Sequence, residues 1–227
     1  MKIIVYGEEG WIGKQFCDII KNDTNHTLIP CVHGSLPDNE LDFTHIFSFI
    51  GEIGVPTNGM HITYIGDTSK LTKIISPNVL YLNMRIPING IQDTNNPITK
   101  IIKQGVAYIA HLSISVLPEL LPLSVTLAEM KVCGIINMVN PDTISHAEIL
   151  DLYKDIVDTE YRPIKVANQK QTISDDGGNG ELSLYFPYIP TVKDSIKRLF
   201  IGYKKHTTVD FGFISKTVIN NTMTTNI

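Results

Sequence analysis

Three closely spaced glycines have the spacing that suits the binding of a dinucleotide phosphate. Gly7, Gly10 and Gly13 follow the apolar run Ile3-Ile4-Val5-Tyr6 in the pattern GxxGxxG. In a strand–turn–helix unit, the first glycine permits a tight turn and the second lets the backbone approach a pyrophosphate. The third lets the helix pack close to the strand, and free N–H groups at the helix start hold the phosphates. The alternative interpretation is a glycine-rich turn that binds nothing.

The elements that must position such a turn are short, β-branched apolar runs separated by amphipathic segments. The predicted strands are Lys2–Tyr6, Thr27–Val32, His45–Ile50, His61–Ile65, Val79–Met84 and Ile135–Val139. The predicted helices run from Trp11 to about Lys21, within Asn96–Lys103, within Pro118–Glu129, from His146 to Val157, and after Thr191. Ser145 and Glu148 form a capping box before the fourth of these helices. This order predicts an α/β fold with a Rossmann-like, doubly wound parallel sheet and a small C-terminal substrate-side subdomain.

Two connections are too short for ordinary crossovers between parallel strands, which need a dozen or more residues. Little room for a helix lies between Val32 and His45, and almost none lies between Ile50 and His61. The sheet is therefore expected to have reduced crossovers. We expect residues 1–202 to form the main domain with an interleaved substrate part. For the polar tail, residues 203–227, two alternatives stay open: disorder, or an edge strand at Val209–Phe213.

Composition narrows the classes of function. The chain has 227 residues, 43% hydrophobic and 19% charged, with a net charge of −4 and no basic stripe, which argues against nucleic-acid binding. No apolar run is long enough to span a membrane. Cys17, Cys31 and Cys133 are widely spaced, without metal-ligand spacing, and are expected to be buried residues of a reducing compartment. We therefore expect a cytoplasmic protein that uses no metal ion.

From Met84 onward the chain carries more specific segments. They are Arg85-Ile86-Pro87-Ile88, Pro97-Ile98-Thr99-Lys100-Ile101, Glu119-Leu120-Leu121-Pro122, Asn140-Pro141 and Ser145-His146-Ala147-Glu148-Ile149-Leu150. Together with Gly7–Gly13 and Ser48-Phe49-Ile50-Gly51, this order resembles the UDP-4-keto-6-deoxyglucose 3,5-epimerase/4-reductases of rhamnose synthesis in plants and giant viruses. These enzymes are grouped with the dTDP-4-dehydrorhamnose reductases among the extended short-chain dehydrogenases/reductases. The resemblance covers most of residues 1–200, and the abundance of Ile, Asn, Lys and Thr is compatible with a giant-virus source.

The resemblance implies that NADP(H) binds in the N-terminal half and that a nucleotide-sugar is the substrate. The cofactor-binding residues that it suggests are Gly7, Gly10, Trp11, Ile12, Gly13, His33, Gly51 and Arg85. The absence of an acidic residue in Val32–Ser35 favours NADP over NAD, because NAD-binding sites carry an acid about 20 residues after the glycines. The suggested substrate-binding residues are Lys100, Ser113, Ser115 and Glu119.

The chain departs from this family at its catalytic residues. The family's acid is the tyrosine of Tyr-x-x-x-Lys, but His61–Ile65 is followed directly by Gly66-Asp67-Thr68-Ser69-Lys70. Lys70, Tyr64 and Thr68 are the remaining catalytic candidates, with either Tyr64 or a water held by Thr68 as the substitute acid. The epimerase cysteine is also absent, and Ser174–Gly178 stands where the family has a pyrophosphate-binding arginine.

Two functions therefore stay open. The first is an NADP-dependent epimerase/reductase of a nucleotide-linked 4-keto-6-deoxy sugar. The second is a catalytically inactive nucleotide-binding scaffold or regulatory subunit of the same fold, which acts through a homodimer or a protein partner. The family's active-site residues and loops are lost selectively, while the core strands and the capped helices are retained. This pattern favours the scaffold or regulatory function.

Overall fold

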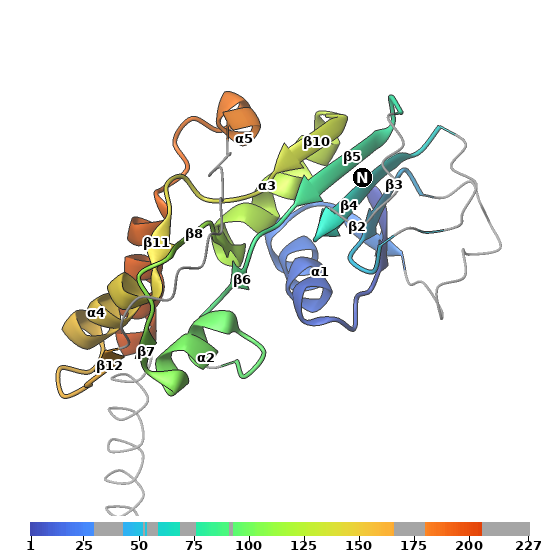
Figure 1. Cartoon of the computed structure of the whole chain (residues 1–227). Coiled ribbons are helices and arrows are strands. Elements are labelled where there is room, and N and C mark those ends of the chain that lie inside the picture. Colours follow the sequence, from blue (N-terminus) through green and yellow to red (C-terminus); the bar gives the residue numbers. More distant parts are fainter. Residues whose placement is uncertain are drawn as a thin grey trace, which may run out of the picture. The chain divides into compact units, whose positions relative to one another are not determined.

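The structure is a computed structural model that describes residues 1–29, 43–51, 53, 59–68, 76–90, 93–165 and 180–205 (Figure 1). The chain divides into two compact units. Unit 1 comprises Met1–Ile88, Ser113–Thr143 and Ser174–Val192. Unit 2 comprises Asn89–Leu112, Ile144–Ile173 and Lys193–Ile227.

Unit 1 is built on a six-stranded sheet in which every neighbouring pair of strands is parallel. Its strands are β1 (Lys2–Tyr6), β2 (Thr27–Ile29), β3 (His45–Ser48), β4 (His61–Gly66), β5 (Val79–Asn83) and β10 (Gly134–Asn137), in the order β10-β5-β4-β3-β1-β2. The chain passes from β1 to β2 on one side and returns to β3 on the other. The strand order therefore reverses between β1 and β3, and in open α/β sheets ligands bind at the carboxyl ends of the strands at such a point.

The six predicted strands are confirmed, and so is the Rossmann-like α/β class. The described part of the connection between β3 and β4, residues 49–51, 53, 59 and 60, contains no helix, as the short spacing predicted. The connection between β2 and β3 falls mostly on residues 30–42, which lie outside the described residues, as does the predicted end of the second strand at Val32.

The two faces of the sheet bury different sets of side chains. Helices α1 (Trp11–Asp23) and α3 (Leu117–Glu129) pack on one face, where Phe16 of α1 lies 4.5 Å from Phe47 of β3 between ring centroids. Alternate strand residues point to the other face, as the two-residue period of a strand requires. That second cluster includes Tyr6, Tyr64 and Tyr81.

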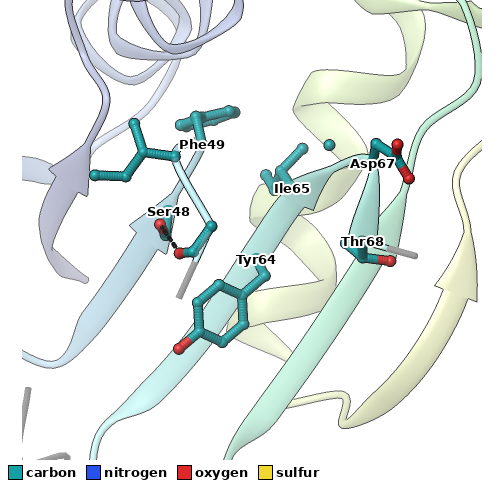
Figure 2. A pocket seen from close by; sticks show the side chains of 9 residues that line it. Ser48, Phe49, Tyr64, Ile65, Asp67 and Thr68 are labelled. Carbon is teal, nitrogen blue, oxygen red and sulfur yellow. Dashed lines mark hydrogen bonds between the residues drawn. The ribbon is translucent and has the colours of Figure 1, made fainter. Parts of the chain in front are cut away.

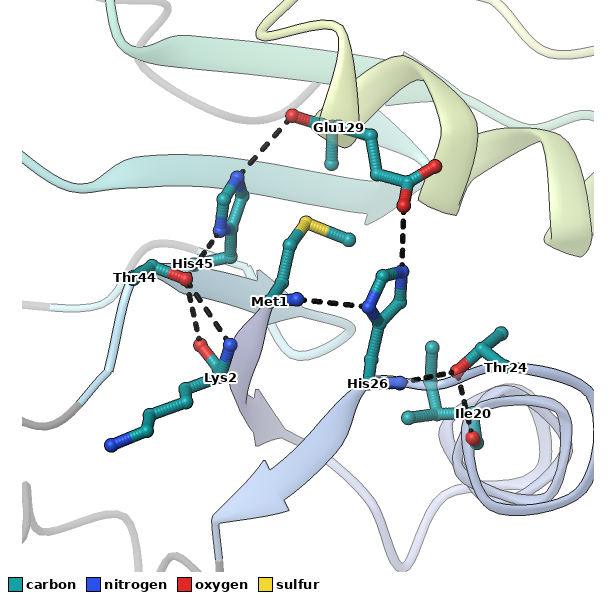
Figure 3. Close-up of polar contacts among 9 residues, drawn as sticks. Met1, Lys2, Ile20, Thr24, His26, Thr44, His45 and Glu129 are labelled. Carbon is teal, nitrogen blue, oxygen red and sulfur yellow. Dashed lines mark hydrogen bonds and ion pairs between the residues drawn. The ribbon is translucent and has the colours of Figure 1, made fainter.

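Histidines at the amino ends of the strands contact the C-terminal end of α3 and the residues after it, and Figure 3 shows His45 among them. His45, at the start of β3, places Nε2 3.3 Å from the Ala128 carbonyl oxygen, and His61, at the start of β4, places Nε2 2.8 Å from that of Val132. Because a carbonyl oxygen only accepts, each ring donates its Nε2–H. Burial, followed by the neighbouring His61, lowers the pKa of His45 from 6.5 to about 4, and burial also lowers the pKa of His61. Both rings are therefore neutral near pH 7.

Shorter elements complete unit 1. β6 (Pro87–Ile88) pairs in parallel with β9 (Ser115–Val116), and α5 (Gly180–Tyr185) contacts β10. None of these was predicted, because two-residue strands and a six-residue helix carry too few residues to show a hydrophobic period. Cys17 is buried as expected, but Cys133 is exposed, so the expectation of burial is wrong there.

Unit 2 contains the other predicted helices. They are α2 (Pro97–Gln104), α4 (His146–Ile156) and residues 193–205 of the helix that begins at residue 192. The predicted capping box is confirmed, since the Ser145 hydroxyl accepts from the Glu148 N–H at 3.2 Å and Glu148 Oε2 accepts from the Ser145 N–H at 3.0 Å. The unit also pairs β7 (Val106–Ala107) with β12 (Ile164–Lys165) and β8 (His111–Leu112) with β11 (Ile144–Ser145).

The expected boundary between a main domain and a tail at residues 202 and 203 stays a prediction. Helical structure continues through residue 205, and residues 206–227 lie outside the described part of the chain. Across the described ranges, none of the helices has both the length and the apolar character needed to cross a bilayer.

Candidate functional site

The glycine turn lies at the carboxyl end of β1 and leaves no room for side chains. Gly7 has φ +85°, and a Cβ there would lie 2.6 Å from Ile50 Cγ2. A Cβ on Gly13 would overlap the Gly7 carbonyl oxygen and lie 2.8 Å from its carbonyl carbon. The first and third glycines are thus required by the left-handed backbone and by the close approach of α1 to the turn.

The start of α1 leaves backbone donors for an anion. Gly10 is the N-cap, no side chain caps the helix, and the Gly10 N–H donates to the Gly7 carbonyl at 3.0 Å. The N–H groups of Trp11, Ile12 and Gly13 have no acceptor within the helix, because the Lys14 N–H is the first to bond back, to the Gly10 carbonyl at 2.9 Å. The positive end of the helix dipole favours a negative charge there. Glu8 and Glu9 are exposed in the same turn, and their carboxylates oppose an anion through a solvent-screened repulsion.

Trp11 and Ile12 are half-buried and pack against the core cluster beneath the sheet face. The Trp11 carbonyl also accepts a hydrogen bond from Gln15 Nε2 at 3.0 Å. The side chains of Trp11 and Ile12 therefore anchor α1. The groups of these two residues that can contact a cofactor are their backbone N–H groups.

A pocket of about 340 Å³ lies at the carboxyl ends of β3 and β4 (Figure 2). Its lining includes Ser48 at the end of β3, Phe49 and Gly51 after that strand, Tyr64 on β4 and Thr68 after it. The Ser48 hydroxyl donates to the Gly51 carbonyl at 2.7 Å. The pocket adjoins the glycine turn, because a Cβ on Gly7 would meet the side chains of Phe49 and Ile50. Turn and pocket thus share the edge at which the strand order reverses.

Two catalytic candidates line this pocket but differ in how they face it. Thr68 is 1% exposed, and its Oγ1 has no hydrogen-bond partner among the described residues. The Tyr64 ring stacks on Tyr81 at 5.2 Å, in the cluster on the second sheet face, and Figure 2 shows it turned away from Thr68. A buried hydroxyl without a partner costs free energy, so Thr68 is the group with most to gain from a bound ligand. Lys70, the third candidate, lies outside the described residues, as does the cofactor candidate His33.

Arg85 follows the carboxyl end of β5 and is exposed. Its backbone is fixed from both sides by Ser115, whose hydroxyl accepts from the Arg85 N–H at 3.0 Å and whose N–H donates to the Arg85 carbonyl at 2.8 Å. The next residue, Ile86, has φ +37°, a conformation that a β-branched residue rarely adopts. The backbone that carries the Arg85 side chain is therefore held in place at the carboxyl edge of the sheet, where ligands bind in such folds.

The predicted substrate residues are distributed over both units. Ser115 is fully buried and donates its hydroxyl to the Met138 carbonyl at 2.6 Å, so the fold itself uses that group. Ser113 is buried in unit 1, where Glu119 accepts a hydrogen bond from Asn140 Nδ2 at 3.0 Å. Lys100 is exposed on α2 in unit 2.

The spacing Tyr-x-x-x-Lys does occur at Tyr161 and Lys165, far from the family's position. The Tyr161 hydroxyl donates to the Ile102 carbonyl at 2.6 Å, and Lys165 lies on β12 rather than one helical turn away. This pair does not have the helical geometry of the family motif. Sequence reasoning did not place Ser48, Phe49, Ile50, Ile65, Gly66 or Asp67 in the site. Their signal was their position near the carboxyl ends of two predicted strands.

The described residues bring together no group of three or more His, Cys, Asp or Glu side chains that would hold a metal ion.

The parallel sheet, its strand order and the glycine turn define the chain as a Rossmann-like α/β protein. No family model matches it. Over 140 residues it is 34% identical to the trifunctional UDP-glucose 4,6-dehydratase/UDP-4-keto-6-deoxy-D-glucose 3,5-epimerase/UDP-4-keto-L-rhamnose-reductase RHM1 of Arabidopsis thaliana, covering 57% of this chain and 21% of that protein. Over 142 residues it is 32% identical to a bifunctional dTDP-4-dehydrorhamnose 3,5-epimerase/reductase of the same plant, covering 58% and 46%. The chain thus spans less than half the length of these relatives, and the predicted resemblance is confirmed.

Solved structures show the same fold. The L780 UDP-rhamnose synthase of Acanthamoeba polyphaga mimivirus matches with a TM-score of 0.67 and 19% identity, over 88% of this chain and 99% of that one. RMD of Pseudomonas aeruginosa, solved with NADPH, matches with a TM-score of 0.62 and 14% identity, over 90% and 98%.

Proposed function

We propose that the chain binds NADPH at its glycine turn and acts as an epimerase/reductase on a UDP- or dTDP-linked 4-keto-6-deoxy sugar, in rhamnose-type nucleotide-sugar synthesis. The observation that carries the proposal is the cradle formed by Gly7, Gly10 and Gly13 next to a pocket at the reversal of strand order. The names of the Arabidopsis relatives support the substrate class. These nucleotide-sugars and NADPH are consistent with a cytoplasmic location.

The residues present fit the pyrophosphate of such a cofactor. A side chain on Gly13 would fill the cradle, and the N–H groups of Trp11, Ile12 and Gly13 lie at the positive end of α1. Arg85, fixed at the carboxyl end of β5, supplies a cation for a phosphate or ribose group. When bound, NADPH supplies the hydride for reduction of the keto carbon.

The pocket residues supply orientation and polarisation. The Thr68 hydroxyl donates a hydrogen bond to the keto oxygen or to a water beside it, and this stabilises the negative charge that develops on that oxygen. Because the Tyr64 ring is stacked on Tyr81 and faces away, we propose that a water held by Thr68, and not the Tyr64 phenol, delivers the proton.

A second function is favoured by one specific observation. Tyr64, the tyrosine that lines the pocket, is packed within the sheet cluster, and no lysine follows it at the helical spacing that lowers a phenol pKa in the family. A protein with the fold but without this pair would bind the cofactor without turnover. Such a chain would act as a regulatory subunit, within a homodimer or with a protein partner.

One experiment separates the two. NADPH fluorescence is recorded before and after adding UDP-4-keto-6-deoxyglucose, with the native chain and with Thr68→Val and Tyr64→Phe. The proposal expects binding followed by oxidation, a large loss of rate in Thr68→Val and little change in Tyr64→Phe.

Thr63→Val is the matched control for the threonine variant. Thr63 is also buried on β4, its hydroxyl also has no partner among the described residues, and it does not line the pocket. Binding without oxidation would support the regulatory function instead, and no binding would overturn both.

A further inference from the structure

Asp67 lines the pocket at the carboxyl ends of β3 and β4, and none of the chemistry above uses it. It is the one carboxylate among the described residues of the lining, and it directly precedes Thr68. Asp67 is exposed, whereas Thr68 is 1% exposed. A carboxylate that can exchange protons with solvent thus stands beside a buried hydroxyl in the same pocket.

The backbone that carries Asp67 is held on both sides. Gly66, at the end of β4, pairs in register with Asn83 of β5, and its carbonyl accepts from the Met84 N–H at 2.8 Å. On the other side, Thr68 is buried. Figure 2 shows Asp67 and Thr68 next to each other, just beyond the end of β4. The carboxylate is therefore carried at a defined point of the carboxyl edge.

Open space adjoins this point at Gly66. A Cβ built on Gly66 would meet nothing within 4 Å. The pocket has a volume of about 340 Å³, which is within the range of small-molecule sites, about 300–1,000 Å³. A small substrate can therefore reach the segment Gly66-Asp67-Thr68 without displacing a side chain at the glycine.

Asp67 and Thr68 supply the two groups that proton abstraction beside a carbonyl requires. That reaction needs a base for the C–H bond and a hydrogen-bond donor for the oxygen on which negative charge develops. An ionised carboxylate accepts the proton, and a threonine hydroxyl donates the hydrogen bond. The Cα atoms of adjacent residues are about 3.8 Å apart, so a keto group held by Thr68 brings its neighbouring carbon close to Asp67.

We propose that Asp67 is the general base of the epimerase step; this inference rests on the proposed function. The Asp67 carboxylate takes the proton from a carbon next to the keto carbon, the C–H electron pair moves into an enolate, and the Thr68 hydroxyl stabilises the enolate oxygen. A water on the opposite face then gives a proton to that carbon, and the enolate electrons form the new C–H bond with inverted configuration. The hydroxide left by that water takes the proton from Asp67, so no atom or electron is gained or lost.

The test is the exchange of deuterium into UDP-4-keto-6-deoxyglucose in D₂O, followed by mass spectrometry. The full chain is used with NADP⁺ in place of NADPH, so that proton abstraction is measured without hydride transfer. The native chain should exchange deuterium faster than a blank without protein. Asp67→Asn should lower this rate at least about a hundredfold, as the loss of a general base does. Asp67→Glu keeps a carboxylate and should retain a measurable part of the rate.

Asp18→Asn is the matched control, because Asp18 is an exposed carboxylate of α1 in the same unit and does not line the pocket. Its exchange rate should equal that of the native chain, and circular dichroism should show that all three variants are folded. An exchange rate that Asp67→Asn leaves unchanged, or that Asp18→Asn lowers equally, would overturn the inference and leave the proposed function standing.

The same preparations, assayed with NADPH, separate this inference from the reductase. NADPH oxidation by a native chain that exchanges no deuterium would overturn the role of Asp67 and leave the reduction standing. Deuterium exchange that depends on Asp67, without NADPH oxidation, would support the role of Asp67 and overturn the reduction. The absence of both reactions would overturn the proposed function and this inference with it.

Discussion

The two edges of the central sheet in unit 1 are built differently. At the amino edge, His45 and His61 use their Nε2–H groups to close the end of α3, and His26 places Nε2 2.9 Å from Glu129 Oε1 (Figure 3). At the carboxyl edge, the Thr68 hydroxyl has no partner among the described residues and a pocket remains open (Figure 2). At the amino edge the histidine Nε2 atoms thus contact α3 and the residues after it, whereas at the carboxyl edge the Thr68 hydroxyl lies beside a pocket without such a partner.

The largest effect is expected at the glycine turn. Gly13→Ala places a Cβ against the Gly7 carbonyl, so α1 must move away from β1. We expect a loss of about 2–3 kcal/mol in the free energy of unfolding, and loss of NADPH binding. Urea denaturation and NADPH titration measure the two effects.

Gly202→Ala is its control, because nothing lies within 4 Å of a Cβ there and the residue is helical. It should be neutral or stabilising. An unaffected stability in Gly13→Ala would show that the close approach of α1 is not required.

The amino edge should be sensitive to acid. The pKa of His45 falls from 6.5 to about 4 on folding, because burial disfavours its charged form. The unfolded chain therefore binds the proton first, and stability is lost as the pH falls from 6.5 towards 4, by up to about 3 kcal/mol from this residue. Burial of His61 acts in the same direction.

His45→Gln should flatten this loss when unfolding free energies are compared between pH 7.5 and pH 4.5. A slope that His45→Gln leaves as steep as in the native chain would contradict the assignment of a structural role to this edge.

A smaller loss in the free energy of unfolding is expected at Ser115, a residue of the carboxyl edge whose hydroxyl bonds to other parts of the chain. Ser115→Ala removes the donor to the buried Met138 carbonyl and the acceptor for the part-buried Arg85 N–H. The free energy of unfolding should fall by about 2 kcal/mol, because the groups left behind lose their partners. Thermal unfolding followed by circular dichroism measures it, and an unchanged midpoint would show that Arg85 is fixed by other contacts.

The smallest effect on stability is expected at Thr68. Thr68→Val removes a hydroxyl that has no partner among the described residues, so the free energy of unfolding should change by less than about 0.5 kcal/mol. A loss of more than about 1 kcal/mol in urea denaturation would show that the hydroxyl serves the fold, and the contrast between the two edges would then fail at this residue.

The features that the sequence predicted are local ones. The glycine spacing, the capping box of Ser145 and Glu148, and the apolar β-branched strands each depend on residues close together in the chain. Their geometry follows from backbone rules that act over a few residues. The fold class was therefore predictable, and so was the turn at the start of the candidate site.

The features that the sequence did not predict depend on distant pairs. His45 meets the Ala128 carbonyl 83 residues away, and Ser115 meets that of Met138 23 residues away. A buried Ser or His can hydrogen-bond to a ligand or to another part of the chain. Which of the two it does depends on such distant partners, and no local sequence pattern specifies them. The orientation of Tyr64 towards Tyr81 likewise depends on which face of the sheet it occupies.

The central claim, that the carboxyl edge at α1 holds the phosphates of a dinucleotide, is tested most directly by NADPH titration of Gly10→Asp. Gly10 has φ −71° and ψ 156°, an extended backbone that an aspartate adopts, and aspartate is a favoured N-cap. A Cβ there would lie 3.1 Å from the Gly7 carbonyl oxygen, so the turn must shift slightly to admit it. The account predicts a chain that stays folded, with at most a small change in the midpoint of unfolding, together with loss of NADPH binding, because the new carboxylate occupies the anion site. Unchanged NADPH binding by a folded Gly10→Asp chain would contradict it.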